Sequence, residues 1–194
     1  MGLISNGTTI FDNGAMTSGA GSMTLVSSAT ASSSASIEFS LGSYKEYKFF
    51  FVNIHPATNS AKFTCNASID NGSNYNVVKT TTYWTAYHAE NDIAAAMQYN
   101  ALEDVAQSTG YFNISTNVAN QNDSCIGGYF HLFNPSSTTY VKHFIGRMSV
   151  DNNYYSQDEY VAGYFNDTND LTNISFKFTS GNIDDGKILM FGIN

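Results

Sequence analysis

The sequence predicts an all-β fold: an antiparallel β-sandwich of the jelly-roll kind with an extended N-terminal arm. Polar and apolar residues alternate along one stretch after another, which is the period-two pattern of a strand with one buried face. About ten such stretches follow each other at short spacing and are separated by turn-forming residues. Regularly spaced short strands of this kind are typical of sandwiches and jelly rolls.

The 194 residues fit one domain with an N-terminal extension. Residues 1–22 are rich in Gly, Ser, Thr and Asn, and we interpret them as an arm that is ordered only when it docks on another surface. Residues 23–194 then form the β-sandwich domain. The candidate attachment residues of the arm are its apolar side chains: Leu3, Ile4, Ile10 and Phe11.

Two segments need separate interpretation. Residues 44–54 are apolar on both faces, which predicts a central strand covered by protein on each side. Residues 92–106 have helix-forming residues but no apolar stripe at helical spacing, so we expect a short strand followed by a loop or short helix. The expected strands are 23–28, 37–41, 44–54, 62–69, 75–88, 97–100, 111–115, 126–134, 139–150, 158–165, 172–179 and 187–193.

Several polar clusters are interpreted as turns or strand ends. Residues 70–74 (Asp-Asn-Gly-Ser-Asn) predict a hairpin-type turn between two strands, because Asn and Gly adopt positive φ at little cost. Residues 134–137 predict a second hairpin. Residues 184–186 (Asp-Asp-Gly) are also interpreted as a turn, and Asp158-Glu159 as the solvated start of a strand. The first cluster and residues 166–170 carry oxygen ligands but lack the complete calcium-loop pattern.

Charge and hydropathy exclude several classes of partner. The net charge is −8, the pI is about 4.7 and the eight basic residues are scattered, so we expect no nucleic-acid partner. The first residues show no signal-peptide pattern, and no apolar run approaches the roughly 20 residues that span a bilayer. We therefore expect no membrane partner and synthesis in a cytoplasm.

Residue types that perform chemistry are scarce, with two Cys, four His and one Trp in the chain. Cys65 lies in a strand-like alternation and is interpreted as a small buried hydrophobe, and a reducing compartment disfavours a bridge to Cys125. His131 and His143 lie on the two arms of a hairpin and could form half a metal site, but a third ligand is not evident, which favours hydrogen-bonded histidines. We expect no enzyme activity, cofactor or metal.

Exposed aromatic residues are the remaining candidates for binding. Their faces could stack on the pyranose rings of a carbohydrate, and in a chain with 14% aromatic residues packing in the core or at a subunit interface is the stronger alternative. The residues concerned are Trp84, Tyr87, Tyr154 and Tyr155.

Several blocks, taken together, resemble a family of virion proteins encoded by tailed phages of marine bacteria. The similarity spans nearly the whole chain, and members of the family are mostly described as structural or hypothetical proteins. The blocks that carry it are residues 3–10, 44–47 through 53–58, 131–139 through 141–144, 162–166, and 180–186 through 191–193.

The resemblance implies a place on a phage particle and brings no catalytic residues with it. It favours a capsid-decoration or other particle-surface protein that is made in the host cytoplasm and resides in the virion. Its expected partners are the major capsid protein or a tail protein, and further copies of itself, with a trimer favoured because virion sites often offer threefold symmetry. The alternative is a tail-fibre or receptor-binding module that recognises host surface carbohydrate.

Overall fold

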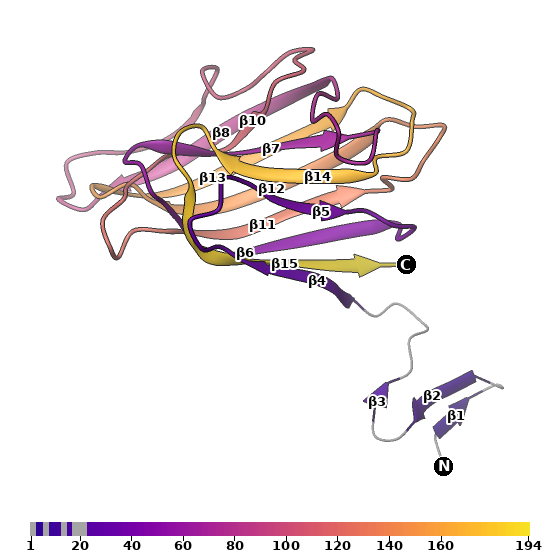
Figure 1. Cartoon of the computed structure of the whole chain (residues 1–194). Coiled ribbons are helices and arrows are strands. Elements are labelled where there is room, and N and C mark those ends of the chain that lie inside the picture. The colour runs from indigo at the N-terminus through magenta and orange to yellow at the C-terminus, as the bar shows by residue number, and fades with distance from the viewer. Residues whose placement is uncertain (1–2, 6–7, 13–14, 17–22) are drawn as a thin grey trace.

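The computed structural model describes residues 3–5, 8–12, 15–16 and 23–194, and within these residues every regular element is a strand (Figure 1). The all-β prediction is therefore confirmed. The predicted arm lies partly outside the described residues. Its described parts are β1 (Leu3–Ser5), β2 (Thr8–Asp12) and β3 (Ala15–Met16), which pair antiparallel in the order β1-β2-β3. Two of the four candidate attachment residues lie in β1 and two in β2.

The rest of the chain forms two packed antiparallel sheets of unequal width (Figure 1). The smaller sheet has the order β10 (Phe112–Val118), β7 (Ala61–Ser68), β14 (Asn173–Phe178) and β5 (Ile37–Ser40). The larger sheet has the order β4 (Thr24–Thr30), β15 (Ile183–Ile193), β6 (Glu46–Pro56), β11 (Ile126–Phe133), β12 (Lys142–Asp151), β13 (Tyr155–Phe165), β8 (Lys79–Ala89) and β9 (Ala95–Tyr99).

The connections are those of a jelly roll. From β5 to β8 the chain changes sheets at every step, β8 and β9 pair in the larger sheet, and β10 returns to the smaller one. The eight strands of the jelly roll are β10-β7-β14-β5 in the smaller sheet and β4-β15-β6-β11 in the larger one. The strands β12, β13, β8 and β9 continue the larger sheet beyond β11. These four strands make the larger sheet twice as wide as its partner.

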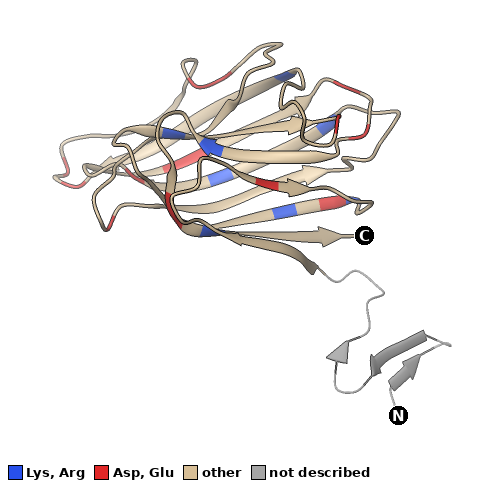
Figure 2. Ribbon diagram, viewed as in Figure 1, with Lys and Arg blue, Asp and Glu red and all other residues tan. Residues whose placement is uncertain are grey.

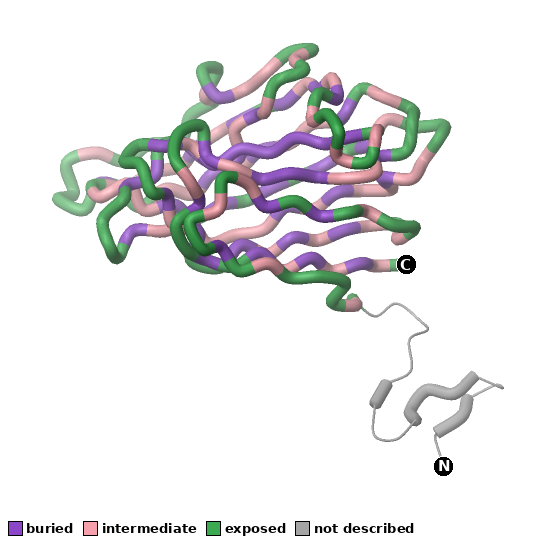
Figure 3. The backbone as a smooth tube through the Cα atoms, in the orientation of Figure 1, coloured by how far each residue is buried: buried purple, intermediate pink, exposed green. Residues whose placement is uncertain are grey.

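Phenylalanine rings fill the space between the sheets. Burial alternates along most strands, as the sequence pattern predicts, and Figure 3 shows the buried positions of both sheets along facing strands. Phe176, on β14, lies at the centre: its ring centroid is 5.2 Å from that of Phe51 and 5.3 Å from that of Phe49, and it also packs on Phe63 and Phe130. A second group of rings, Phe112, Phe144 and Phe165, continues the core toward β13.

The structure corrects the expectation that strand 44–54 is covered on both faces. Tyr47, Phe49 and Phe51 are buried between the sheets, but Phe50 and Val52 point to the outer face of the larger sheet, where no second layer lies among the described residues. Phe50 packs edge-on against Phe191 of the neighbouring strand, with 5.6 Å between the ring centroids. The outward apolar residues thus cover each other in the plane of the sheet.

Two predicted turns also differ from expectation. Asn71 and Gly72 have positive φ, as expected, but the segment links β7 in one sheet to β8 in the other, so it is not a hairpin turn. Residues 184–186 do not form a turn between elements: they lie in the bulged first part of β15, where Gly186 has a φ of 112°. A Cβ there would approach the backbone of Asn53, so the bulge requires glycine. The hairpin predicted at 134–137 is confirmed by the pairing of β11 with β12.

Replacement of Phe176 by Ala should lower the free energy of unfolding by about 3–5 kcal/mol, because the cavity would lie between both sheets and several fixed rings. Urea denaturation followed by tyrosine and tryptophan fluorescence measures the change. Leu102→Ala is the matched control, since Leu102 is 87% exposed and its loss should alter stability little. Equal effects of the two substitutions would contradict this description of the core.

Candidate functional site

The inner face of the larger sheet is left open at one end. β10, the edge strand of the smaller sheet, packs against β12 and β13. β8 and β9 continue the larger sheet beyond these strands, so their inward side chains extend past the cover that the smaller sheet provides. The inner face of the larger sheet therefore meets solvent at β8 and β9.

A cavity of about 260 Å³ lies there. The pairing register explains how its lining residues come together: Thr85 of β8 lies between Glu159 of β13 and Gln98 of β9, and Tyr87 is the partner of Gln157. Because side chains of cross-strand partners share a face, two adjacent rows of polar and aromatic groups point inward at this end. The residues that line the cavity are Thr85, Tyr87, Gln98, Asn100, Asn152, Tyr155 and Gln157.

The four aromatic candidates from the sequence do not form one surface. Tyr87 and Tyr155 meet in the cavity as an edge-to-face pair, with ring centroids 5.5 Å apart and planes at 87°. Tyr154, in the turn between β12 and β13, lines a different depression beside β10. Trp84 lies on the opposite face of β8 from Tyr87, as the period of two requires. Of the four candidates, only Tyr87 and Tyr155 therefore contribute to the wall of this cavity.

Trp84 belongs instead to a continuous row that crosses the outer face of the larger sheet. Its ring stacks on that of Tyr160, with centroids 3.9 Å apart and planes at 3°. The guanidinium of Arg147 lies 4.8 Å from the Tyr160 ring centroid, and the amino group of Lys48 lies 4.8 Å from that of Tyr129. The register aligns this outer row, one residue from each of seven strands: Leu189, Phe50, Tyr129, Arg147, Tyr160, Trp84 and Tyr99.

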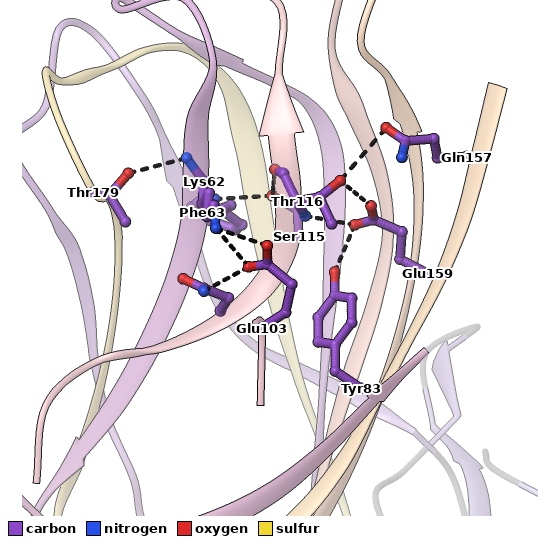
Figure 4. A network of polar contacts seen from close by, with 10 residues as sticks. Lys62, Phe63, Tyr83, Glu103, Ser115, Thr116, Gln157, Glu159 and Thr179 are labelled. Carbon is purple, nitrogen blue, oxygen red and sulfur yellow. Dashed lines mark hydrogen bonds and ion pairs between the residues drawn. The ribbon is translucent and has the colours of Figure 1, made fainter. Parts of the chain in front are cut away.

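A buried carboxylate lies directly beside the cavity, and this corrects the interpretation of Asp158-Glu159 as a solvated strand start. Glu159 is 1% exposed, whereas Asp158 faces outward and pairs with Arg147 at 2.7 Å. The hydroxyl of Tyr83 donates to Glu159 Oε2 at 2.7 Å and the Thr116 amide donates at 2.8 Å, and the Thr116 hydroxyl donates to Oε1 (Figure 4). Burial raises the pKa of Glu159 to about 7 despite these donors.

The same network connects the cavity to the interior. Thr116 Oγ1 also lies 3.4 Å from Oε1 of Gln157, which lines the cavity (Figure 4). Near the start of β10, the carboxylate of Glu103, in the loop before this strand, accepts hydrogen bonds from the amino group of Lys62 at 2.7 and 2.8 Å. It also accepts one from the side-chain amide of Asn113, on β10, at 2.8 Å. Polar groups thus replace the phenylalanine core where the edge strand β10 stops covering the larger sheet.

The remaining chemical candidates lie apart from this cavity. His131 is hydrogen-bonded to Glu46 at 2.8 Å, in line with the favoured interpretation of hydrogen-bonded histidines, and its cross-strand partner is Ile145, not His143. Cys65 is fully buried, as predicted, and both Cys65 and Cys125 are free thiols. Among the described residues, no three His, Cys, Asp or Glu side chains gather in a way that could hold a metal ion. Charged positions are dispersed over strands and loops (Figure 2).

The fold and the cavity define a jelly-roll protein with an elaborated larger sheet and a polar, aromatic cleft at one end. Comparison of the chain with protein-family models, with curated proteins and with solved structures found no match. In the part of the chain that the structure describes, no helix is long and apolar enough to cross a membrane.

The residues that sequence reasoning missed are Thr85, Gln98, Asn100, Asn152, Gln157 and the buried Glu159. The signal that could have found Thr85 is the alternation within 83–87, which puts Thr85 on the same face as Tyr83 and Tyr87 and opposite Trp84. Thr85 and Tyr87 lie beside Gln98 and Gln157 only because β8 pairs with β9 and β13, and the sequence pattern of one strand does not predict its neighbours.

Glu159 should make the stability of the protein decrease as pH rises. Its pKa is about 7 in the folded protein against 4.5 for an unperturbed Glu, so between these values the folded state holds a proton that the unfolded chain releases. The free energy of unfolding should fall by about 3 kcal/mol from about pH 4.5 to about pH 7 and then level off. Glu159→Gln should remove this part of the pH dependence in urea titrations.

Asp158→Asn is the matched control for this experiment. Arg147 lowers the pKa of the Asp158 carboxyl, so that group titrates below the window and its removal should leave the slope between about pH 4.5 and about pH 7 unchanged. A wild-type protein whose stability rises across this window relative to Glu159→Gln would show that Glu159 is ionised when folded.

Proposed function

We propose that this chain is a non-enzymatic structural protein of a phage virion, a capsid-decoration or other protein of the particle surface. The observation that carries the proposal is the outer row, a band of aromatic and cationic side chains that crosses the exposed face of the larger sheet. Val52 and Ile145 lie on the same face and are each 44% exposed. An exposed sheet face with this composition is typical of an interface.

We assign this face to contacts between copies of the chain, in a symmetric homo-oligomer for which a trimer is our expectation. Aromatic residues and arginine are enriched at interfaces, and both are present in the outer row. Further support comes from the resemblance of several sequence blocks to virion proteins of tailed phages. The jelly-roll scaffold also suits a particle, since a closely packed core of aromatic rings holds its two sheets together.

The N-terminal arm supplies the attachment in this proposal. Residues 1–22 contain the apolar residues Leu3, Ile4, Ile10 and Phe11, and we assign to them the contact with the major capsid protein or a tail protein. The localisation that follows is the virion, with synthesis in the host cytoplasm.

Deletion of residues 1–22 should leave the sandwich folded and remove the protein from particles. The thermal midpoint and circular dichroism of the shortened chain check folding, and quantitative gel analysis of purified particles measures occupancy. Occupancy equal to that of the full chain would overturn the role of the arm.

The double substitution Val52→Lys and Ile145→Lys should dissociate the oligomer, because each chain would bring two further charges to a face that must lose water on association. Sedimentation velocity measures the oligomeric state. The matched control is Ile69→Lys, at a residue that is 38% exposed and follows β7 of the other sheet. A wild-type monomer, or an oligomer that survives the double substitution, would contradict the assignment of this face.

A second candidate function, a tail-fibre module that recognises host surface carbohydrate, is favoured by one specific observation. The cavity combines the Tyr87–Tyr155 pair with amide side chains. Aromatic rings pack against the C–H face of a sugar ring, and amide groups form hydrogen bonds with its hydroxyls. Binding of the isolated wild-type protein to host cells, abolished by prior removal of their surface polysaccharide, is the result this candidate requires.

A further inference from the structure

One polar atom in the cavity lacks the partner that its burial demands. Thr85 is 2% exposed and lines the cavity, and its hydroxyl is the buried side-chain oxygen or nitrogen for which no hydrogen-bond partner exists among the described residues. A buried polar group without a partner destabilises a protein, so natural structures supply one. The neighbouring Thr81, by contrast, accepts a hydrogen bond from the amide of Val105 on the same face of β8.

The groups around Thr85 offer donors and acceptors without formal charge. Gln98, Asn100, Asn152 and Gln157 each carry one carbonyl oxygen and one NH₂ group. The carbonyl oxygen of Asn152 accepts from the backbone amides of residues 154 and 155, at 3.2 and 3.0 Å, which fixes its orientation and leaves its NH₂ group available. No Asp, Glu, Lys, Arg or His lines the cavity.

The remaining wall is aromatic and is set in position by the backbone. Tyr155 follows the turn that Asn152 holds, and its ring packs edge-on against Tyr87 on the adjacent strand. Aromatic faces suit the C–H surface of a sugar ring, and neutral amides and hydroxyls suit its equatorial and axial OH groups, which are both donors and acceptors.

We propose that this cavity binds one ring of a neutral saccharide, with the Thr85 hydroxyl as a hydrogen-bond partner of a sugar OH group. The proposal deepens the second candidate function and rests on it. A volume of about 260 Å³ is small for a drug-sized ligand and suits a single ring. An acidic sugar should bind more weakly, because no cation lines the cavity and the chain carries a net charge of −8.

The cavity and the outer row lie on opposite faces of the larger sheet, so saccharide binding does not compete with contacts between copies through that face. Of the four aromatic candidates named from the sequence, Trp84 takes no part in this cavity, since its ring is stacked against Tyr160 on the outer face. The sugar is therefore held in a cleft by one inward face of three strands.

The test is titration of the isotope-labelled full chain with glucose, galactose, mannose and N-acetylglucosamine, each at millimolar concentration, followed by amide chemical shifts. At least one of these neutral sugars should shift the amides of Thr85, Tyr87 and Gln157 with a saturable curve, and glucuronic acid should bind at least about tenfold more weakly than that sugar. Absence of saturable shifts at these residues with all four sugars would overturn the proposal.

Thr85→Val is the decisive variant, because it keeps the shape of the side chain and removes only the hydroxyl. It should weaken sugar binding about tenfold or more while the thermal midpoint stays the same or rises, since the lost hydroxyl has no protein partner. Thr82→Val, on the outer face of the same strand, is the matched control and should bind as wild type. Unchanged affinity in Thr85→Val, or a lowered thermal midpoint, would show that the hydroxyl serves the fold or a water molecule instead.

Tyr155→Ala provides a second line of evidence, since it removes one aromatic wall at a partly exposed position. It should also weaken binding by about tenfold. Failure of all sugar titrations with normal particle attachment would refute the site and leave the structural role standing. Loss of attachment in the arm deletion has no bearing on the titrations.

Discussion

The unequal width of the two sheets is the constraint on which the rest of the structure depends. Eight strands face four, so the smaller sheet can cover only the middle of the larger one. Beneath that cover lies a core of phenylalanine rings around Phe176, which contacts rings from β5 and β7 of the smaller sheet and from β6 and β11 of the larger one. Beyond it, inward positions meet solvent and must be polar. The cavity beside β8 and β9 follows from this geometry.

The transition from apolar core to cavity passes through buried polar groups. Glu159 accepts hydrogen bonds from Thr116 and Tyr83 at β10, the edge strand of the smaller sheet. The ion pair of Lys62 with Glu103 lies farther along the same strand. Such networks are stable only when each member is paired. The hydroxyl of Thr85, the direct cross-strand partner of Glu159, is the exception among the described residues, and this contrast is the basis for proposing a ligand there.

Local patterns predicted the class of fold and most of the strands, because the period of two is a property of each strand alone. The same patterns could not reveal neighbours. The strand at 44–54 is apolar on both sides, yet its outer residues cover each other within one sheet, and Asp158-Glu159 reads as a hydrophilic strand start although Glu159 is buried. Tyr87 and Tyr155 were predicted as candidates from composition, but their meeting depends on the pairing of β8 with β13.

The arrangement separates two roles on one sheet: an outer face suited to other copies of the chain, and an inner edge suited to a small neutral ligand. A cryo-electron microscopy map of the intact particle tests this account most directly. The account predicts density for the two-layer sandwich on the particle surface, with the outer row against a neighbouring copy and the cavity beside Thr85 open to solvent. Particles without this density, or with the cavity buried against a structural neighbour, would contradict it.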